Sequence, residues 1–313
     1  MDVTAAPARK PNLALRILRF PVTLIAIEFI AFGVLGLPLE SINLVPVGGA
    51  SPPELFAIVI VAVVVFILTW KAFRRWAEGE RDREFTLPGA GKEVGAGLLA
   101  GSVLFTLITG LVALLGGIEV TGVRSFGGTQ FWMWAGVGIT SGIVEETLFR
   151  GVLLRQLEKL VGTWWALALT SILFGAVHLS NLDATWAGAI GITLEAGILL
   201  GAAYLYTRRL WFAAGLHAAW NFTQGWVFSI PVSGTGQPIG MLVTERHGPD
   251  WLTGGKFGLE ASVVAVFVAT VAGLFLLWKG FRKGRFVAPI WARRSDEAVR
   301  VNVDADPHAL GER

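Results

Sequence analysis

The sequence predicts an all-α polytopic membrane bundle of about eight transmembrane helices with both termini in the cytoplasm. Three observations predict this fold. The 313 residues are 54% hydrophobic and only 16% charged, whereas soluble domains carry about 25% charged residues. Apolar runs recur at the length of ~20 residues that a bilayer requires. The basic residues form short clusters between those runs, which is typical of membrane topology and not of a nucleic-acid-binding face.

The apolar runs place eight helical spans along the chain. They lie near residues 20–38, 54–73, 94–117, 131–155, 163–180, 186–206, 211–230 and 258–279. Basic residues precede the first span and follow the second, fourth, sixth and eighth: Arg16 and Arg19, Arg74 and Arg75, Arg155 and Lys159, Arg208 and Arg209, Arg282 and Lys283. The alternate connections carry few basic residues, so the positive-inside rule places both termini in the cytoplasm.

The same pattern divides the chain into three parts. Residues 1–19 form a basic cytoplasmic segment, 20–280 an intramembrane domain with its motif core at 140–225, and 281–313 a polar tail that we expect to be disordered. We expect the first span to be retained, because "GLPLESINL" offers no small-x-small cleavage site. The chain has no cysteine, which excludes disulfides, thiolate metal sites and a cysteine nucleophile.

Ionisable and polar residues inside the expected spans are the candidates for function, because a charge at mid-membrane costs about 2.5–3.5 kcal/mol on insertion scales. They are Glu28, Glu145, Glu146, Arg150, His178, Glu195, His217 and Asn221. Glu146 and Arg150 are four residues apart, so they can pair on one side of a helix. Glu145, about 100° further round, then points elsewhere.

The spacing of the candidates along their helices places several of them at one depth. At ~1.5 Å per residue, Glu145 and Asn221 lie roughly equally deep when counted from the basic ends of their spans. His217 is one turn shallower than Asn221 on the same helical stripe, and His178 is about a turn deeper unless its helix is tilted. Polar groups from three helices therefore meet near one level.

A carboxylate, two imidazoles and a carboxamide are sufficient to hydrolyse a peptide bond. A carboxylate and a histidine can hold a water and accept its proton, and a second histidine and an asparagine can donate to the oxyanion. Other intramembrane proteases fit less well. No H-E-x-x-H motif occurs, no aspartate lies in a span, and Ser141 lacks the histidine context of a serine protease and is better interpreted as a helix-packing residue.

Three short motifs carry a resemblance to a known family. "EETLFRG", "FGAVH" and "HAAWN" occur in this order within residues 140–225. They resemble the E-E-x-x-x-R, F-x-x-x-H and H-x-x-x-N blocks of the CPBP family, also called the Abi or CAAX protease-like family. The resemblance implies an eight-helix intramembrane endopeptidase similar to the enzymes that trim prenylated CAAX proteins.

The resemblance also implies a role for each motif residue. Glu145 would be the general base with His178 as its partner, and His217 and Asn221 would form the oxyanion site. Glu146 and Arg150 would be the supporting pair, with Phe174 the first residue of the second block. We expect no cofactor. The alternative is zinc or another divalent metal held by Glu145, His178 and His217, which is a legitimate catalytic set.

The remaining candidates have plainer interpretations. Glu28 is expected to serve helix packing or to be a snorkelling helix end. Glu195 is expected to face the cavity or to be a protonated structural carboxyl, and His247 and His308 to be solvated. A non-catalytic immunity or scaffold protein of the same family is the main alternative function, and a proton-coupled transporter is a weaker one because no internal repeat is visible. The expected partners are a peptide or lipidated-protein substrate and the bilayer, without nucleic acid, in a multi-pass protein of the cell membrane.

Overall fold

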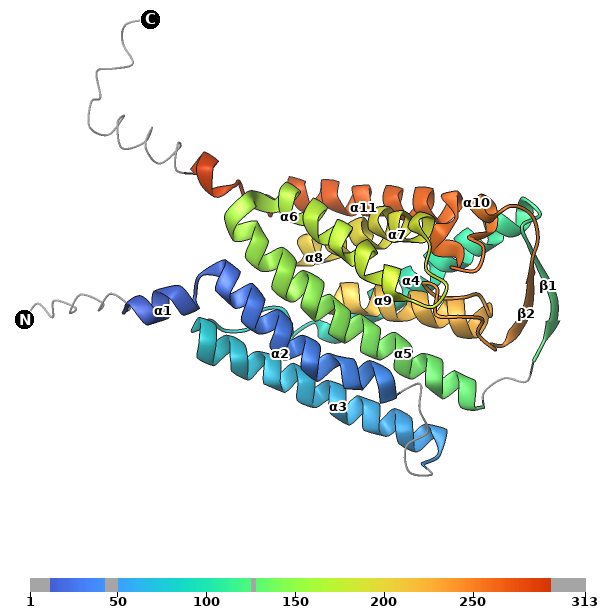
Figure 1. Ribbon diagram of the computed structural model, residues 1–313, viewed down its shortest axis with the longest axis horizontal. Coiled ribbons are helices and arrows are strands. Elements are labelled where there is room, and N and C mark those ends of the chain that lie inside the picture. Colours follow the sequence, from blue (N-terminus) through green and yellow to red (C-terminus); the bar gives the residue numbers. More distant parts are fainter. Residues whose placement is uncertain (1–11, 43–49, 125–127, 294–313) are drawn as a thin grey trace, which may run out of the picture.

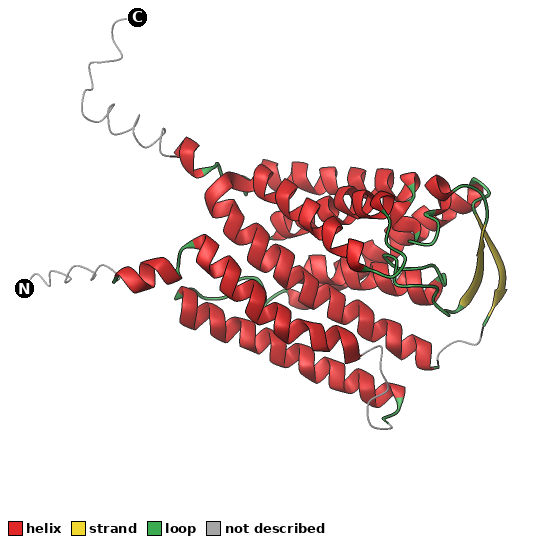
Figure 2. Cartoon of the chain, viewed as in Figure 1, coloured by secondary structure: helices red, strands yellow, loops and turns green. Residues whose placement is uncertain are grey.

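Each of the eight apolar runs forms helix in the computed structural model, which describes residues 12–42, 50–124 and 128–293. The expected all-α fold is therefore confirmed for this part of the chain (Figures 1 and 2). The α-helices are α1 (Leu13–Leu18), α2 (Pro21–Ile42), α3 (Pro52–Phe73), α4 (Ala90–Leu114), α5 (Thr129–Glu146), α6 (Arg155–Val177), α7 (Trp186–Ile192), α8 (Ile198–Thr207), α9 (Trp211–Phe222), α10 (Asp250–Thr253) and α11 (Val263–Arg282).

Short π-helical and 3₁₀ turns extend or join these helices. The π-helical turns are η1 (Arg74–Glu78), η2 (Thr147–Leu154), η4 (Thr193–Gly197) and η5 (Thr223–Val227), and the 3₁₀ turns are η3 (His178–Ser180) and η6 (Leu259–Ala261). The two strands are β1 (Ile118–Val123) and β2 (Leu242–Arg246). Two of the π-helical turns contain a candidate site residue, Arg150 in η2 and Glu195 in η4, and such turns occur frequently at functional sites.

Among the described residues, six helical segments are long and apolar enough to cross a membrane. They are Pro21–Leu39, Pro52–Glu78, Ala90–Leu114, Thr129–Ser180, Trp186–Thr207 and Val263–Arg282. The fourth contains two of the expected spans, because Gly162 adopts φ +76° and lets the chain turn back on itself between them. The protein is thus an integral multi-pass membrane protein, while the count of eight crossings and the side of each terminus stay predictions.

The expected seventh span is the centre of the bundle and not a lipid-facing helix. α9 and η5 are largely buried, and α9 packs most extensively against α4 and α5. α8 packs against α11, while α2 and α3 lie side by side and cover α5 from the other side (Figure 1). Two large clusters of buried apolar side chains, one around Phe32 and Trp70 and one around Phe105 and Phe174, fill the space between these layers.

The basic connections meet at one end of the bundle, opposite the strands (Figure 1). Nε of Arg19 donates to the carbonyl of Ala77 at 3.2 Å, and Nη2 of Arg208 donates to Oε1 of Glu158 at 2.9 Å. Nη1 of Arg209 donates to the carbonyl of Pro88 at 2.8 Å. The connections that the charge pattern assigns to one side of the membrane are therefore neighbours in the folded chain.

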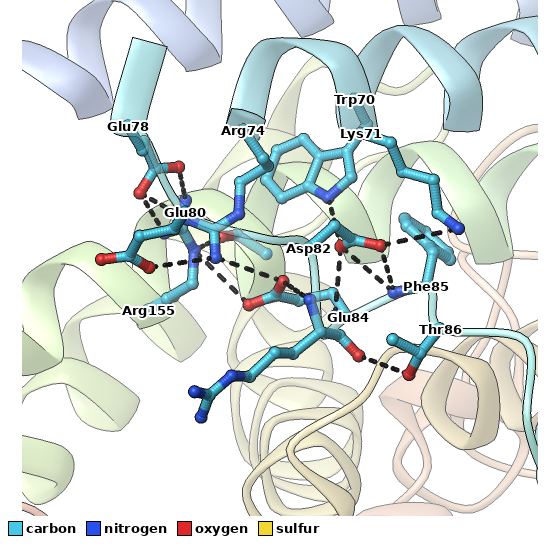
Figure 3. Close-up of polar contacts among 12 residues, drawn as sticks. Trp70, Lys71, Arg74, Glu78, Glu80, Asp82, Glu84, Phe85, Thr86 and Arg155 are labelled. Carbon is cyan, nitrogen blue, oxygen red and sulfur yellow. Dashed lines mark hydrogen bonds and ion pairs between the residues drawn. The ribbon is translucent and has the colours of Figure 1, made fainter. Parts of the chain in front are cut away.

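A buried ionic cluster at this end explains Glu28. Nη2 of Arg155 lies 3.1 Å from Oε2 of Glu28 and 2.9 Å from Oε1 of Glu78, and Arg74 pairs with Glu78 and Glu84 (Figure 3). Glu28 is fully buried in this pairing. Its expected role in helix packing thus takes the form of an ion pair that ties α2 to the start of α6.

The connections between the expected spans at 118–130 and 231–257 contribute the two strands of a small antiparallel sheet. β1 pairs with β2 in the register Ile118 to Arg246 through Val123 to Leu242, with an irregularity between Val120 and Gly122. Sequence analysis missed both strands because they are short and lie among Gly-rich turns. The sheet crosses the end of the bundle that lies opposite the basic connections (Figure 1).

The first residues of the expected disordered tail pack against α6. The backbone N–H of Thr163 donates to the carbonyl of Val287 at 3.0 Å, and the ring of Phe286 lies 4.9 Å from that of Trp164. Residues 294–313, including His308, lie outside the described part of the chain.

Candidate active site

The first motif forms a buried ion pair at the junction of α5 and η2, as its spacing predicts. Nη1 of Arg150 lies 2.8 Å from Oε1 of Glu146, and both side chains are buried. The guanidinium stacks 4.4 Å over the ring of Phe174, while its Nη2 donates to the carbonyl of Ala196 at 3.2 Å. Arg150 therefore connects the first motif with the second motif and with η4.

Glu146 is more than the partner of Arg150, because it also holds His217. Nδ1 of His217 lies 3.0 Å from the same Oε1 of Glu146. The other ring nitrogen, Nε2, lies 4.0 Å from Oε2 of Glu145. The two adjacent glutamates thus flank one imidazole: Glu146 fixes its orientation, and Glu145 faces its free side with a side chain that is 24% exposed.

His178 lies beside Phe174 at the end of α6. Its Nδ1 lies 2.6 Å from the carbonyl of Phe174, so this nitrogen carries the proton and Nε2 offers a lone pair. The Phe174 ring lies 5.0 Å from the His178 ring and 6.1 Å from the His217 ring. The F-x-x-x-H spacing therefore serves packing: Phe174 sets the separation of the two imidazoles.

Asn221 obtains its orientation from Ser141, which sequence analysis assigned only to helix packing. Nδ2 of Asn221 donates to Oγ of Ser141 at 2.9 Å, and the Ser141 hydroxyl donates to the carbonyl of Val137 at 2.8 Å. Because an amide has two N–H donors, Asn221 keeps one for another acceptor. Ser141 lies four residues before Glu145, a helical spacing that indicates a shared face.

Glycines bring α9 close enough for these contacts. A Cβ added at Gly138 or Gly142 on α5 would collide with the backbone of α9, and so would one at Gly97 or Gly101 on α4. Small residues at a spacing of four allow such close approach of membrane helices. α9, which carries His217 and Asn221, is therefore held between two glycine-lined helices, and this pattern was readable from the sequence.

A small cavity lies beside the motif residues, with room for about one water-sized group. His178, His217 and Asn221 form one part of its wall, and Glu195, Ser233 and Glu260 another. Apolar side chains complete the lining: Phe174, Ile192, Leu199, Leu200, Leu216 and Trp220. Glu195 lines this cavity, which is one of the two positions that the sequence suggested for it. Glu260 lies in the expected eighth span but was not among the candidates; the structure places it in the turn η6, before α11 begins at Val263. Ser233 lies in an irregular segment and carried no sequence signal.

The remaining candidates lie elsewhere. Glu28 belongs to the ionic cluster at the basic end. His247 is half exposed beside the sheet, where its Nε2 lies 3.6 Å from Oε2 of Glu119. This exposed position agrees with its plain interpretation as a solvated residue.

The residues that could hold a metal meet only part of what a metal site requires. Nδ1 of both His178 and His217 is engaged by an oxygen, which leaves Nε2 free on each ring, and metal-ligating histidines have such partners. Within the described ranges, however, no group of three or more His, Asp or Glu side chains is arranged to hold an ion. Each histidine alone is oriented as a metal ligand would be. Together with Glu145, however, the two histidines are not arranged around a common point.

Comparison with known proteins assigns this region to a family. Residues 127–223 match the family model of the Rce1-like type II CAAX prenyl endopeptidases. No curated protein and no solved structure matches the chain. The matched segment spans α5 through α9 and contains all three motifs, in agreement with the resemblance of their sequences. Over residues 127–223, the chain is therefore similar to the Rce1-like type II CAAX prenyl endopeptidase family.

Proposed function

We propose that this protein is an intramembrane endopeptidase that hydrolyses a peptide bond by activating a water. The observation that carries the proposal is the position of His217 between two carboxylates, 3.0 Å from Glu146 and 4.0 Å from Glu145. Only Glu145 of the two lacks an ion pair with arginine, and it is the more exposed. A carboxylate that is both free and reachable fits a general base.

In this mechanism Glu145 accepts a proton from the attacking water, which forms a bond to the substrate carbonyl carbon. His178 assists by accepting a hydrogen bond from the same water at Nε2, because its Nδ1 is committed to the Phe174 carbonyl. The orientation of this water between a carboxylate and an imidazole replaces a covalent nucleophile, and the attack leaves negative charge on the carbonyl oxygen.

Asn221 and His217 would stabilise that oxygen. Asn221 has one N–H left after it donates to Ser141. His217 can donate from Nε2 only when both ring nitrogens carry a proton, a cation that Glu146 and Glu145 would balance. Donors aimed at a developing oxyanion contribute roughly 10²–10³-fold in rate each.

The proposed substrate is a peptide or a lipidated protein, and the proposed location is the cell membrane. The family name indicates a prenylated C-terminal segment. The site supports an enzyme over an immunity or scaffold protein because such a protein has no need for Glu145 beside an oriented imidazole. A transporter has no need for a donor pair such as His217 and Asn221.

A peptide panel tests the proposal. Purified protein in lipid discs would receive matched prenylated and unprenylated peptides, with cleavage followed by mass spectrometry. We expect wild type to cleave at least one of them and Glu145→Gln to lose cleavage by at least a hundredfold, with an unchanged melting temperature. Glu119→Gln, an exposed carboxyl on β1, is the matched control and should keep full activity.

Retention of most activity in Glu145→Gln would contradict the mechanism, and absence of any cleavage by wild type would favour the non-catalytic alternatives. Elemental analysis and prolonged chelation of the active protein address the metal alternative. Stoichiometric zinc whose removal stops cleavage, and whose return restores it, would replace the metal-free mechanism with one in which the ion activates the water.

A further inference from the structure

Glu195 is a second carboxyl in the candidate active site that neither the sequence motifs nor the mechanism above uses. It is 1% exposed and lines the cavity shared by His178, His217 and Asn221. Among the described residues it makes no hydrogen bond or ion pair, and its Oε2 is a buried polar atom without a partner. A buried polar atom without a partner destabilises the fold, so a purely structural role does not explain it.

The fold holds Glu195 firmly at this place. It sits in the π-helical turn η4, whose packing against α6 depends on glycines: a Cβ at Gly175 would collide with Thr193, and one at Gly197 with Ser171. The next residue, Ala196, accepts the hydrogen bond from Nη2 of Arg150 at 3.2 Å. The arginine that pairs with Glu146 therefore also fixes the turn that presents Glu195 to the cavity.

The surroundings of Glu195 favour its neutral form. Its cavity neighbours Ile192, Leu199 and Leu200 are apolar, and a buried charge without a partner is so costly that the group neutralises instead. The titratable groups that face it across the cavity are His178, His217 and Glu260, and none of them is paired with it. A neutral carboxyl is a hydrogen-bond donor, and the Glu195 side chain lines a cavity with room for about one water-sized group.

Glu260, in contrast to Glu195, has hydrogen-bond donors around its carboxyl group. Its carboxylate oxygens accept from the backbone N–H of Ser233 at 2.9 Å, from the Ser233 hydroxyl at 3.1 Å and from the amide of Gln224. These donors occupy both oxygens of the Glu260 carboxyl. The cavity thus contains one carboxyl whose oxygens are hydrogen-bonded and one, Glu195, whose Oε2 has no partner among the described residues.

We propose that Glu195 is the general acid of the reaction and protonates the departing amine, directly or through the cavity water. This role rests on the proposed function. Glu145 accepts a proton from water as the new carbon–oxygen bond forms; the carbon–nitrogen bond then breaks while the Glu195 hydroxyl proton passes to nitrogen. One water is consumed. Transfer of the proton from Glu145 to Glu195 then returns both carboxyl groups to their starting protonation states. The two carboxyls lie in opposed environments: Glu145 is partly exposed beside His217, and Glu195 is dry and unpaired. Such a difference is the usual basis of a division into base and acid.

The leaving group is the sharpest probe of this role. An amine cannot depart without a proton, whereas a nitrophenolate can. The test uses the peptide that wild type cleaves and a nitrophenyl ester of the same acyl segment. We expect Glu195→Gln to lower kcat for the peptide by roughly 10²–10⁴-fold, with KM and melting temperature near wild type, and to lower kcat for the ester by less than tenfold.

Three variants complete the design. Glu145→Gln should lose both substrates, because both need activated water. Glu195→Asp keeps an acid on a shorter arm and should recover part of the peptide activity. Glu260→Gln changes a carboxyl in the same cavity that is already hydrogen-bonded, so its ratio of ester to peptide turnover should equal that of wild type.

Two results would overturn the assignment while leaving the proposed function standing: peptide turnover by Glu195→Gln at the wild-type rate, or equal losses on peptide and ester. Failure of wild type to cleave either substrate would instead overturn the proposed function and the role of Glu195 with it.

Discussion

At the scale of single residues, Glu146 connects the structure of the site with its chemistry. Its Oε1 accepts from Arg150 at 2.8 Å and lies 3.0 Å from Nδ1 of His217. The same carboxylate therefore neutralises a buried guanidinium and orients an imidazole. The E-E-x-x-x-R spacing indicates only the first of these roles, because the second depends on a residue 71 positions away.

Replacement of Glu146 should consequently affect stability and activity together. Glu146→Gln removes the charge that balances Arg150 and the strong acceptor of His217. Breaking a buried ion pair on one side costs about 3–5 kcal/mol, so we expect a marked fall in melting temperature and loss of cleavage. Thermal unfolding in detergent and the peptide assay measure the two effects. A variant with unchanged stability would show that Arg150 finds another partner.

Glu260, outside the membrane-spanning helices, provides a pH-dependent contribution to stability. Burial raises the pKa of its carboxyl from 4.5 to about 7, with hydrogen bonds from Gln224 and Ser233 opposing the shift. Because the folded state holds its proton more tightly, this stabilisation is fully present below pH 4.5 and is lost as the pH rises through about 7.

We therefore expect the melting temperature of wild type to fall between pH 5 and pH 8 relative to that of Glu260→Gln, which cannot titrate there. Melting curves of both proteins across this range, at constant ionic strength, measure the difference. Parallel curves would show that the carboxyl ionises at its ordinary pKa in the folded protein.

At the scale of helices, the position of α9 decides whether the motifs meet. Gly97 and Gly101 on α4 and Gly138 and Gly142 on α5 allow its backbone to approach from both sides. Three π-helical turns, η2, η4 and η5, follow α5, α7 and α9 near the site. The position of each polar group along its helix sets its depth in the membrane. The close contact between the helices brings these groups together.

A larger residue at one of these glycines should separate the helices. Gly101→Val places its side chain against the backbone of Leu216, next to His217, and we expect a loss of stability of about 1–3 kcal/mol together with reduced cleavage. Gly110→Ala on the same helix meets nothing within 4 Å and should be neutral or slightly stabilising. Comparable melting temperatures for the two variants would contradict the close-packing argument.

At the scale of the whole molecule, one end of the bundle is basic and the other carries the β1–β2 sheet (Figure 1). The ionic cluster of Arg74, Arg155, Glu28 and Glu78 lies at the basic end (Figure 3). The positive-inside rule assigns this end to the cytoplasm. The structure makes the assignment testable with single labels, because exposed positions are available at both ends.

The chain lacks cysteine, so each introduced cysteine reports on one position. Cysteines at the exposed positions Arg81 and Lys283 should react with an impermeant thiol reagent only from the cytoplasmic side, and one at Gln237 only from outside. Labelling of intact cells before and after permeabilisation distinguishes the two. Reaction at Arg81 from outside would reverse the predicted topology.

The sequence by itself determined the properties that depend on local spacing and on solvent preference. Long apolar runs must be helical in a bilayer because backbone groups find no other partners there, and the four-residue spacing of Glu146 and Arg150 makes them neighbours on one helix. The motifs also carry the resemblance to the CAAX protease-like family. Helix depth placed Glu145 and Asn221 at about one level, with His217 a turn shallower and His178 about a turn deeper.

Only the tertiary structure decided which of these groups touch. The contacts of His217 with both glutamates, of Asn221 with Ser141 and of Arg150 with Ala196 join residues far apart in the chain, and no spacing rule fixes how two helices rotate against each other. The place of Glu195 in the cavity, the ion pair of Glu28 and the short β1–β2 sheet were decided in the same way. They result from packing between helices, where close approach at glycines and the burial of charge select one arrangement among many that the apolar pattern permits.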